Sequence, residues 1–224
     1  DTVRRQRQMC IRDRHTLTQC MTDSMGLTGT DTVCGIVPMF HAMGWGIPWS
    51  ALMLGCKQVM PHRFMDPARL LDLMVAEKVT LSAGVPTIWQ GVKGLYEANP
   101  DAYDLSSLSR LTCGGSSPPP SLIRWFWDEL DVEMIQGWGM TETSPLATLS
   151  RRVMKRSQLA LSEDEQFENV AKAGLLMPGL ELDIFDEEFN RLPHDGETVG
   201  EILVRGPWIC SCLLYTSPSP RDRV

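Results

Sequence analysis

The stretch VEMIQGWGMTETSP, residues 132–145, combines an apolar strand pattern with a glycine-rich segment and points to the fold class. Residues 132–135 are expected to form a strand. Ligands of open α/β sheets bind at the carboxyl ends of strands, so the next residues are a candidate binding site. Gly137 and Gly139 let the backbone approach a planar or phosphate group, and Trp138 offers a stacking face. A tight turn with a packed tryptophan explains these three residues equally well.

Two polar residues follow this glycine-rich segment. The hydroxyl of Thr141 is suited to contact a phosphate oxygen, and the carboxylate of Glu142 is suited to hold a hard cation. Thr141 and Glu142 are therefore the candidate catalytic residues, and Glu142 is the candidate metal ligand.

A second glycine-rich segment, CGGSS at residues 113–117, follows an expected strand at 108–113 and precedes an expected helix. This order makes a seat for an anion or a nucleotide, because the free backbone N–H groups at the start of a helix point outward. The segment lacks the spacing of a dinucleotide fingerprint and the lysine of a P-loop, so neither of those sites is predicted.

The third segment is VPMFHAMGW, residues 37–45, which follows an apolar strand expected at 33–37. His41 invites the role of a catalytic base. A single histidine at a strand end is more often packed and hydrogen-bonded, and no Ser or Cys nucleophile with a positioned acid accompanies it. The aromatic content favours the wall of an apolar pocket.

Strands and helices are expected to alternate over residues 15–150. One helix has Asp66 as its N-cap and Pro67 at its first position, and others follow Pro86 and Pro120. The alternation predicts an α/β layered domain with a largely parallel sheet. The strand-like stretches, rich in β-branched residues, are 33–37, 57–60, 79–83, 108–113 and 132–135.

The pattern changes in residues 151–211, which are expected to form a smaller β-rich subdomain of the same domain. Ser162 and Glu165 have the spacing of a capping box and predict a short solvated helix. Strand patterns then return at residues 180–185 and 199–204.

Composition excludes several classes of protein. The 224 residues carry a formal net charge of -7, which argues against nucleic-acid binding and against docking on an anionic membrane. The apolar runs are too short to span a bilayer, and no signal-peptide pattern opens the chain. We therefore expect a cytoplasmic protein with small-molecule partners.

The seven cysteines include no CxxC pair and have no histidine at a ligand-like spacing, so a metal cluster is not expected. Their scatter among apolar residues predicts buried, reduced thiols.

Both ends of the chain resemble translated sequencing adapter. ATG TGT ATA AGA GAC encodes MCIRD at residues 9–13, and TGT CTC TTA TAC ACA TCT encodes CLLYTS at residues 212–217. The reverse complement of the second string contains the first. Residues 1–14 and 212–224 are therefore expected to be artefacts, the alternative being a genuine basic arm and a genuine Pro/Ser tail.

Together, the segments resemble one family, the adenylate-forming or AMP-binding enzymes, and within it the medium- and long-chain fatty acyl-CoA ligases. The resemblance implies that residues 15–211 belong to the family's N-terminal α/β domain, with its C-terminal domain absent. The matching phrases are VPMFHAMGW, VTLSAGVPTIWQG, CGGSSPPPSLI, QGWGMTETSP and VGEILVRGPWI.

The resemblance also implies a two-step reaction. A carboxylate, here a fatty acid, attacks the α-phosphate of ATP and gives an acyl-adenylate and pyrophosphate. The thiol of coenzyme A then displaces AMP. The implied cofactors are ATP, Mg²⁺ and coenzyme A as co-substrate, and the parent protein is expected to be able to form a homodimer.

The family's residue roles carry over onto matching positions. Trp138 is implied to stack on adenine, although the family often has Phe or Tyr there. Thr141 is implied to contact phosphate and Glu142 to hold Mg²⁺. The nucleotide site is implied to comprise Gly115, Gln136, Gly137, Trp138, Gly139, Met140 and Thr141. The acyl pocket is implied to comprise His41, Trp45 as its gate, Gly114 and Gly115.

Parts of the family pattern are missing from this chain. No Ser/Thr/Gly-rich loop ending in Lys precedes Asp31, and residues 27–30 are too few to form one. The family's ribose-binding Asp and catalytic Lys would follow the last residue. Because such groups stabilise charge as it develops, we expect the chain by itself not to turn over. Acyl-CoA formation above the level of a Glu142→Ala control would contradict this expectation.

Two alternatives stay open. The first is a ligase for short, aryl or sulfur-containing carboxylates; residues 41–45 favour an elongated apolar tunnel instead, by analogy. The second is a non-catalytic ATP- or AMP-binding homologue. Thr141 and Glu142 speak against it, because a pure binding scaffold has no need for a metal ligand beside a phosphate contact.

Overall fold

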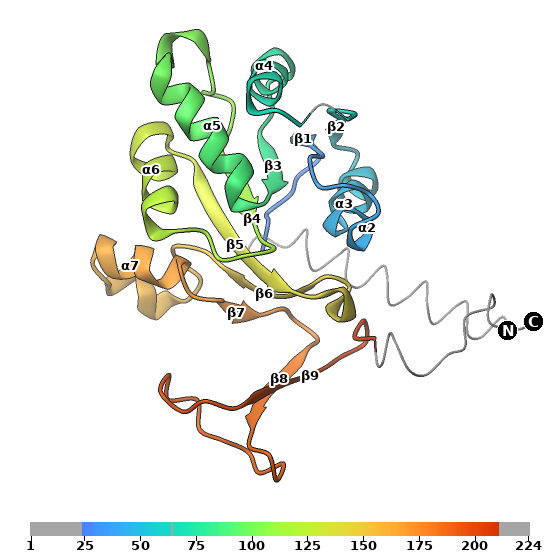
Figure 1. Cartoon of the computed structure of the whole chain (residues 1–224), viewed down its shortest axis with the longest axis vertical. Coiled ribbons are helices and arrows are strands. Elements are labelled where there is room, and N and C mark those ends of the chain that lie inside the picture. The colour runs from blue at the N-terminus through green and yellow to red at the C-terminus, as the bar shows by residue number, and fades with distance from the viewer. Residues whose placement is uncertain (1–23, 64, 211–224) are drawn as a thin grey trace, which may run out of the picture.

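The computed structural model describes residues 24–63 and 65–210 (Figure 1). The adapter-like ends, residues 1–14 and 212–224, lie outside this part. The described residues form a seven-stranded sheet, in the order β2-β1-β3-β4-β5-β6-β7, and a two-stranded sheet of β8 and β9. The strands are β1 Thr32–Cys34, β2 Lys57–Val59, β3 Leu81–Gly84, β4 Arg110–Cys113, β5 Glu133–Gly139, β6 Leu146–Ser150, β7 Leu175–Leu176, β8 Glu181–Phe185 and β9 Glu201–Arg205.

The large sheet is mostly parallel, as the sequence predicts. Strands β2, β1, β3, β4 and β5 pair in parallel, whereas β6 and β7 add on in antiparallel orientation. The strands that follow β1 in the chain lie on both sides of it, with β2 on one side and β3 on the other. Such a switch point opens a crevice at the carboxyl ends of the strands.

Helices cover both faces of the large sheet (Figure 1). Helices α4, α5 and α6 pack on one face, and α3 packs on the other. The connection from β1 to β2 runs across the sheet in the opposite direction to the later connections. Because crossovers between parallel strands are right-handed, its helix α3 lies on the face opposite to α4, α5 and α6. The helices are α2 Ala42–Trp45, α3 Ile47–Leu54, α4 Pro67–Glu77, α5 Pro86–Ala98, α6 Pro120–Leu130 and α7 Glu163–Val170, with 3₁₀ turns η1 Pro100–Ala102, η2 Thr141–Thr143 and η3 Arg156–Ala160.

The predicted helix starts are confirmed. The carboxylate of Asp66 accepts a hydrogen bond from the backbone N–H of Arg69 at 3.1 Å, which caps α4. Ser162 and Glu165 form the predicted capping box of α7, with the Glu165 carboxylate 2.8 Å from the N–H of Ser162. The apolar face of α4 is buried as expected through Leu70, Leu71 and Met74.

Strand alternation divides the sheet residues between two cores. Met134 contributes to the core under α4, α5 and α6, whereas Ile135 contributes to the core on the other face. Cys34 and Val33 of β1 divide in the same way. The residues two positions apart on each strand therefore share a face.

Strand β5 is longer than the sequence predicts. The alternative of a tight turn at residues 137–139 is wrong, because β5 continues through Gly139. Antiparallel pairing with β6 extends it, with Gly137 opposite Leu149 and Trp138 opposite Thr148, and a bulge follows Trp138. The candidate stacking residue is therefore held by a β ladder.

The cysteine prediction is confirmed for three residues and wrong for one. Cys34, Cys56 and Cys113 are free and buried, but Cys210 is free and exposed. Burial raises the pKa of Cys34 to about 11 and that of Cys113 to about 12, so both thiols stay protonated and unreactive near neutral pH. The cysteines outside the described part are Cys10, Cys20 and Cys212.

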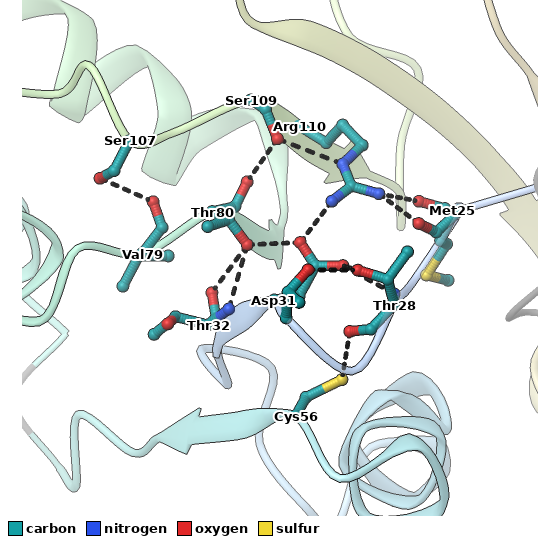
Figure 2. Close-up of polar contacts among 12 residues, drawn as sticks. Met25, Thr28, Asp31, Thr32, Cys56, Val79, Thr80, Ser107, Ser109 and Arg110 are labelled. Carbon is teal, nitrogen blue, oxygen red and sulfur yellow. Dashed lines mark hydrogen bonds and ion pairs between the residues drawn. The ribbon is translucent and has the colours of Figure 1, made fainter.

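A buried ion pair ties the segment before β1 to the sheet (Figure 2). The Asp31 carboxylate accepts hydrogen bonds from the Thr28 N–H at 2.7 Å and the Thr80 hydroxyl at 2.6 Å. Arg110 donates to it at 2.5 Å and to the carbonyl oxygen of Met25 at 3.0 Å. Three segments that are distant in sequence are thereby joined at the amino ends of β1, β3 and β4.

Within the described residues, no helix has both the length and the apolar character that crossing a bilayer requires.

Candidate functional site

A cavity of about 240 Å³ lies where β1, β4 and β5 end. Because parallel strands end at one edge of a sheet, the three sequence segments meet there. The cavity is lined by Met25, His41, Trp45, Thr112, Gly114, Gly115, Gly137, Trp138, Gly139, Met140, Thr141, Pro145 and Leu146. Nearly all the residues expected at the nucleotide and acyl sites are thus brought together. Gln136 and Glu142 are expected site residues that do not line the cavity.

Gln136 points away from the cavity. It shares the face of Met134, because residues two apart on a strand point the same way. Its side-chain nitrogen donates to the carbonyl oxygens of Val170 at 3.0 Å and Ala171 at 3.3 Å, at the end of α7. In this structure the side chain therefore connects β5 to α7.

The wall formed by Trp45 requires a glycine opposite it. A Cβ atom added at Gly114 would lie 3.2 Å from the Trp45 ring and 3.0 Å from the carbonyl oxygen of Gly137. Gly115 next to it has a φ of +80°, which favours glycine. The close approach seats the buried Trp45 ring against the turn after β4.

The rim of the cavity is a tight loop between β5 and β6. Thr143 is 1% exposed, and its hydroxyl accepts a hydrogen bond from the Met140 N–H at 2.8 Å. It also donates within the loop, toward the carbonyl oxygens of Met140 and Pro145. These contacts fix the η2 turn, so Thr141 and Glu142 have a defined place at the rim.

Glu142 lies beside the cavity. Its backbone carbonyl accepts a hydrogen bond from the Cys210 N–H at 2.7 Å, which attaches the segment after β9 to the rim. No group of three or more His, Cys, Asp or Glu side chains in the described residues is arranged to hold a metal ion. Mg²⁺ commonly takes one or two carboxylates and completes its shell with phosphate and water, so Glu142 fits a cation that arrives with a phosphate ligand.

His41 lies at the mouth of the cavity. It is exposed, so the packed position favoured by the sequence is wrong. Its ring centroid is 6.3 Å from that of Trp45. Of the aromatic residues in segment 37–45, His41 and Trp45 line the cavity, whereas Phe40 is 91% exposed and does not.

Four lining residues were not expected from the sequence. Thr112 could have been predicted as a lining residue, because it stands two positions before Gly114 and shares its face. No sequence pattern indicates Met25. Contacts from Arg110 to the Met25 carbonyl and from Arg151 to the Ser24 carbonyl hold that segment against the sheet. The four are Met25, Thr112, Pro145 and Leu146.

Comparison with known proteins identifies the family. The model of the family described as AMP-binding enzyme matches residues 7–214. The chain belongs to the AMP-binding enzyme family. The matched range runs into both end segments that resemble adapter sequence.

Relatives of this AMP-binding chain include acyl-CoA ligases. It is 40% identical to a long-chain-fatty-acid–CoA ligase of Thermus thermophilus, over 87% of this chain and 35% of the relative. It is 38% identical to a 3-methylmercaptopropionyl-CoA ligase of Ruegeria lacuscaerulensis, again over 87% of this chain and 35% of the relative. The chain thus spans about a third of the length of these relatives.

The fold agrees with the family. A crystal structure of a long-chain-fatty-acid–CoA ligase from Archaeoglobus fulgidus superimposes with a TM-score of 0.71 at 24% identity, covering 89% of this chain and 38% of that one. The α/β domain with its mostly parallel sheet is the N-terminal domain of the adenylate-forming enzymes, of which this chain covers a part.

Proposed function

We propose that the parent protein is an ATP-dependent acid–thiol ligase that adenylates a fatty acid and transfers the acyl group to coenzyme A. The observation that supports this most is the shared cavity. Residues before and after β1, residues in and after β4, and residues of β5, the rim loop and β6 line one space that has an exposed rim and an apolar interior. A nucleotide at the rim and an acyl group inside match this division.

The chain's own residues position the nucleotide. Trp138 is half-buried in the cavity wall and offers a ring face to adenine. The backbone at Gly137 and Gly139 carries no side chain that would block a close approach. Thr141 is exposed and lines the cavity, and its hydroxyl is expected to donate to a phosphate oxygen. Together these groups orient the α-phosphate toward the interior.

Glu142 would hold Mg²⁺ together with the triphosphate. The bound cation supplies charge neutralisation that favours departure of pyrophosphate. Glu142 directly follows Thr141 in η2, so the cation held by Glu142 and the Thr141 hydroxyl would act on the same phosphate group.

The acyl group would lie against Trp45. The ring is 9% exposed and borders the cavity together with Met25 and Leu146. Packing of a hydrocarbon chain there removes apolar surface from water. His41 at the mouth marks the entrance.

The test is a calorimetric titration of the chain with AMP. Trp138→Ala should weaken AMP binding about tenfold, because stacking of a base on an aromatic ring is commonly worth that much. Binding is measured instead of turnover because the chain spans about a third of its relatives. Trp49→Ala is the matched control, since Trp49 is exposed on α3 outside the cavity. Equal affinity of both variants and the wild type would contradict the proposal.

The non-catalytic alternative is decided in the same titration. A ligase that uses Glu142 for Mg²⁺ should bind ATP with Mg²⁺ more weakly after Glu142→Gln, whereas AMP binding without metal should not change. Equal affinity of wild type and variant for ATP with Mg²⁺ would favour a non-catalytic nucleotide-binding protein.

The resemblance to a 3-methylmercaptopropionyl-CoA ligase favours a second candidate substrate class, the short sulfur-containing carboxylates.

A further inference from the structure

The buried side chains that line the cavity are apolar apart from one hydroxyl. They form its inner end and belong to Met25, Trp45, Thr112 and Leu146, which are 1%, 9%, 2% and 7% exposed. The rim residues His41, Gly139, Met140 and Thr141 are exposed instead. If the nucleotide occupies the rim, as proposed above, the inner end is where the acyl group lies.

The Thr112 hydroxyl has no hydrogen-bond partner. Its oxygen is buried, and within the described part of the chain Trp89 Nε1 is the other buried side-chain polar atom without one. Other buried hydroxyls of the sheet are satisfied, as in Ser82, which donates to the carbonyl oxygen of Cys34 at 2.9 Å, and Ser150, which donates to that of Asn169 at 2.6 Å. Buried polar groups are nearly always paired in native proteins. A ligand atom would complete the pairing of Thr112.

The charge of that ligand atom is limited by its surroundings. None of the four inner-end residues carries a charge, and the titratable side chain among the described lining residues, His41, is at the rim. A second carboxylate or an ammonium group would be buried without a counter-charge, which is costly. A neutral oxygen or sulfur can accept from a threonine hydroxyl, and oxygen is the stronger acceptor.

We propose that Thr112 makes the inner end a polar subsite for carboxylates whose acyl chain contains a neutral hydrogen-bond acceptor, such as an ether, keto or thioether atom. This inference rests on the proposed function and narrows its substrate class. A purely hydrocarbon chain leaves the hydroxyl unpaired, whereas an acceptor at the matching position pairs it. Such a site discriminates strongly between ligands with and without the acceptor, because a ligand without it leaves the buried hydroxyl unpaired and binds more weakly.

The experiment uses non-hydrolysable acyl-sulfamoyl adenosines as probes, titrated into the chain by calorimetry. The cavity of about 240 Å³ calls for short acyl groups. An ether oxygen is placed at the third, fourth or fifth position of the acyl chain, and each ether is paired with the hydrocarbon analogue of equal length. A thioether at the third position is added as a weaker acceptor.

Wild type should bind at least one ether about tenfold more tightly than its hydrocarbon partner, and that ratio should fall to about one in Thr112→Val. Thr112→Ser keeps a hydroxyl and should preserve the preference. Thr112→Val is close to isosteric and should fold as stably as wild type, because it removes an unpaired buried hydroxyl. Its free energy of unfolding without ligand is measured alongside.

Three outcomes would overturn the inference. In the first, wild type prefers the hydrocarbon at every position. In the second, the ether preference survives in Thr112→Val. In the third, Thr112→Val weakens all probes equally, which would place the hydroxyl on the shared acyl-phosphate group. If wild type bound none of the probes, the proposed function itself would fail, and this result is distinct from the other three.

Discussion

The Asp31→Asn variant is expected to unfold with a free energy about 3 kcal/mol below that of the wild type, because removing one partner of a buried ion pair leaves the other uncompensated. Asp31 is 5% exposed. Arg110 stays in place, since it also donates to the carbonyl oxygens of Met25 and Gly26. Urea denaturation followed by tryptophan fluorescence at neutral pH measures the difference. A loss below about 1 kcal/mol, typical of a surface pair, would contradict the prediction.

The pH dependence gives a second readout of the same carboxylate. Burial by itself raises the pKa of Asp31, but hydrogen bonds from Thr80 and Thr28 and the charge of Arg110 outweigh it and hold the pKa below 3.8. Because the pKa of Asp31 is lower in the folded state, the stabilisation by the ionised carboxylate is complete at pH values above the pKa of the unfolded state. It is lost as the pH falls through the pKa of the folded state. The difference in free energy of unfolding between wild type and Asp31→Asn should therefore be constant above about pH 5 and shrink below about pH 4.

The matched control for this pair of measurements is Asp72→Asn. Asp72 is exposed on α4. Its replacement removes the same charge without opening a buried pair, so a change within about 0.5 kcal/mol is expected. A comparable loss in both variants would assign the effect to net charge.

Gly139→Ala is expected to reduce both stability and nucleotide binding. A Cβ atom at this position would lie 1.8 Å from the carbonyl oxygen of Pro145 and 2.8 Å from the Thr143 hydroxyl oxygen, so the backbone must move. Forced overpacking of this kind costs about 1–3 kcal/mol. Movement of the loop also displaces Trp138 and Thr141, so AMP affinity should fall at least about tenfold.

Gly94→Ala is the matched control for Gly139→Ala. Gly94 lies inside α5, and nothing is within 4 Å of the position that its Cβ would take. Alanine is the better helix former by about 1 kcal/mol, so this variant should be equally or more stable and should bind AMP unchanged. If Gly139→Ala behaved like Gly94→Ala, the tight packing of the rim loop would be refuted.

Much of the fold was predictable from local patterns. Strands β1 to β5 lie close to the stretches rich in β-branched residues, and Asp66 and Ser162 cap α4 and α7 as expected. These features depend on neighbours within a few residues, where propensity and capping are informative. Strand β6 was not predicted. Its pairing with β5 is a long-range choice that the chain makes only when the sheet forms.

The family motifs, the α/β class and the residues expected at the site could all be predicted from the sequence. Which of these residues face the cavity depends on how the strands and loops pack. Gln136 and Gly137 are adjacent in the chain, yet strand alternation turns the first toward α7 and the second toward the cavity wall. Met25 and Thr112 enter the site without belonging to any motif, because Arg110 and Arg151 hold the segment of Met25 and sheet pairing places Thr112. Contacts between residues distant in sequence depend on the whole packed fold, and a local sequence pattern does not predict them.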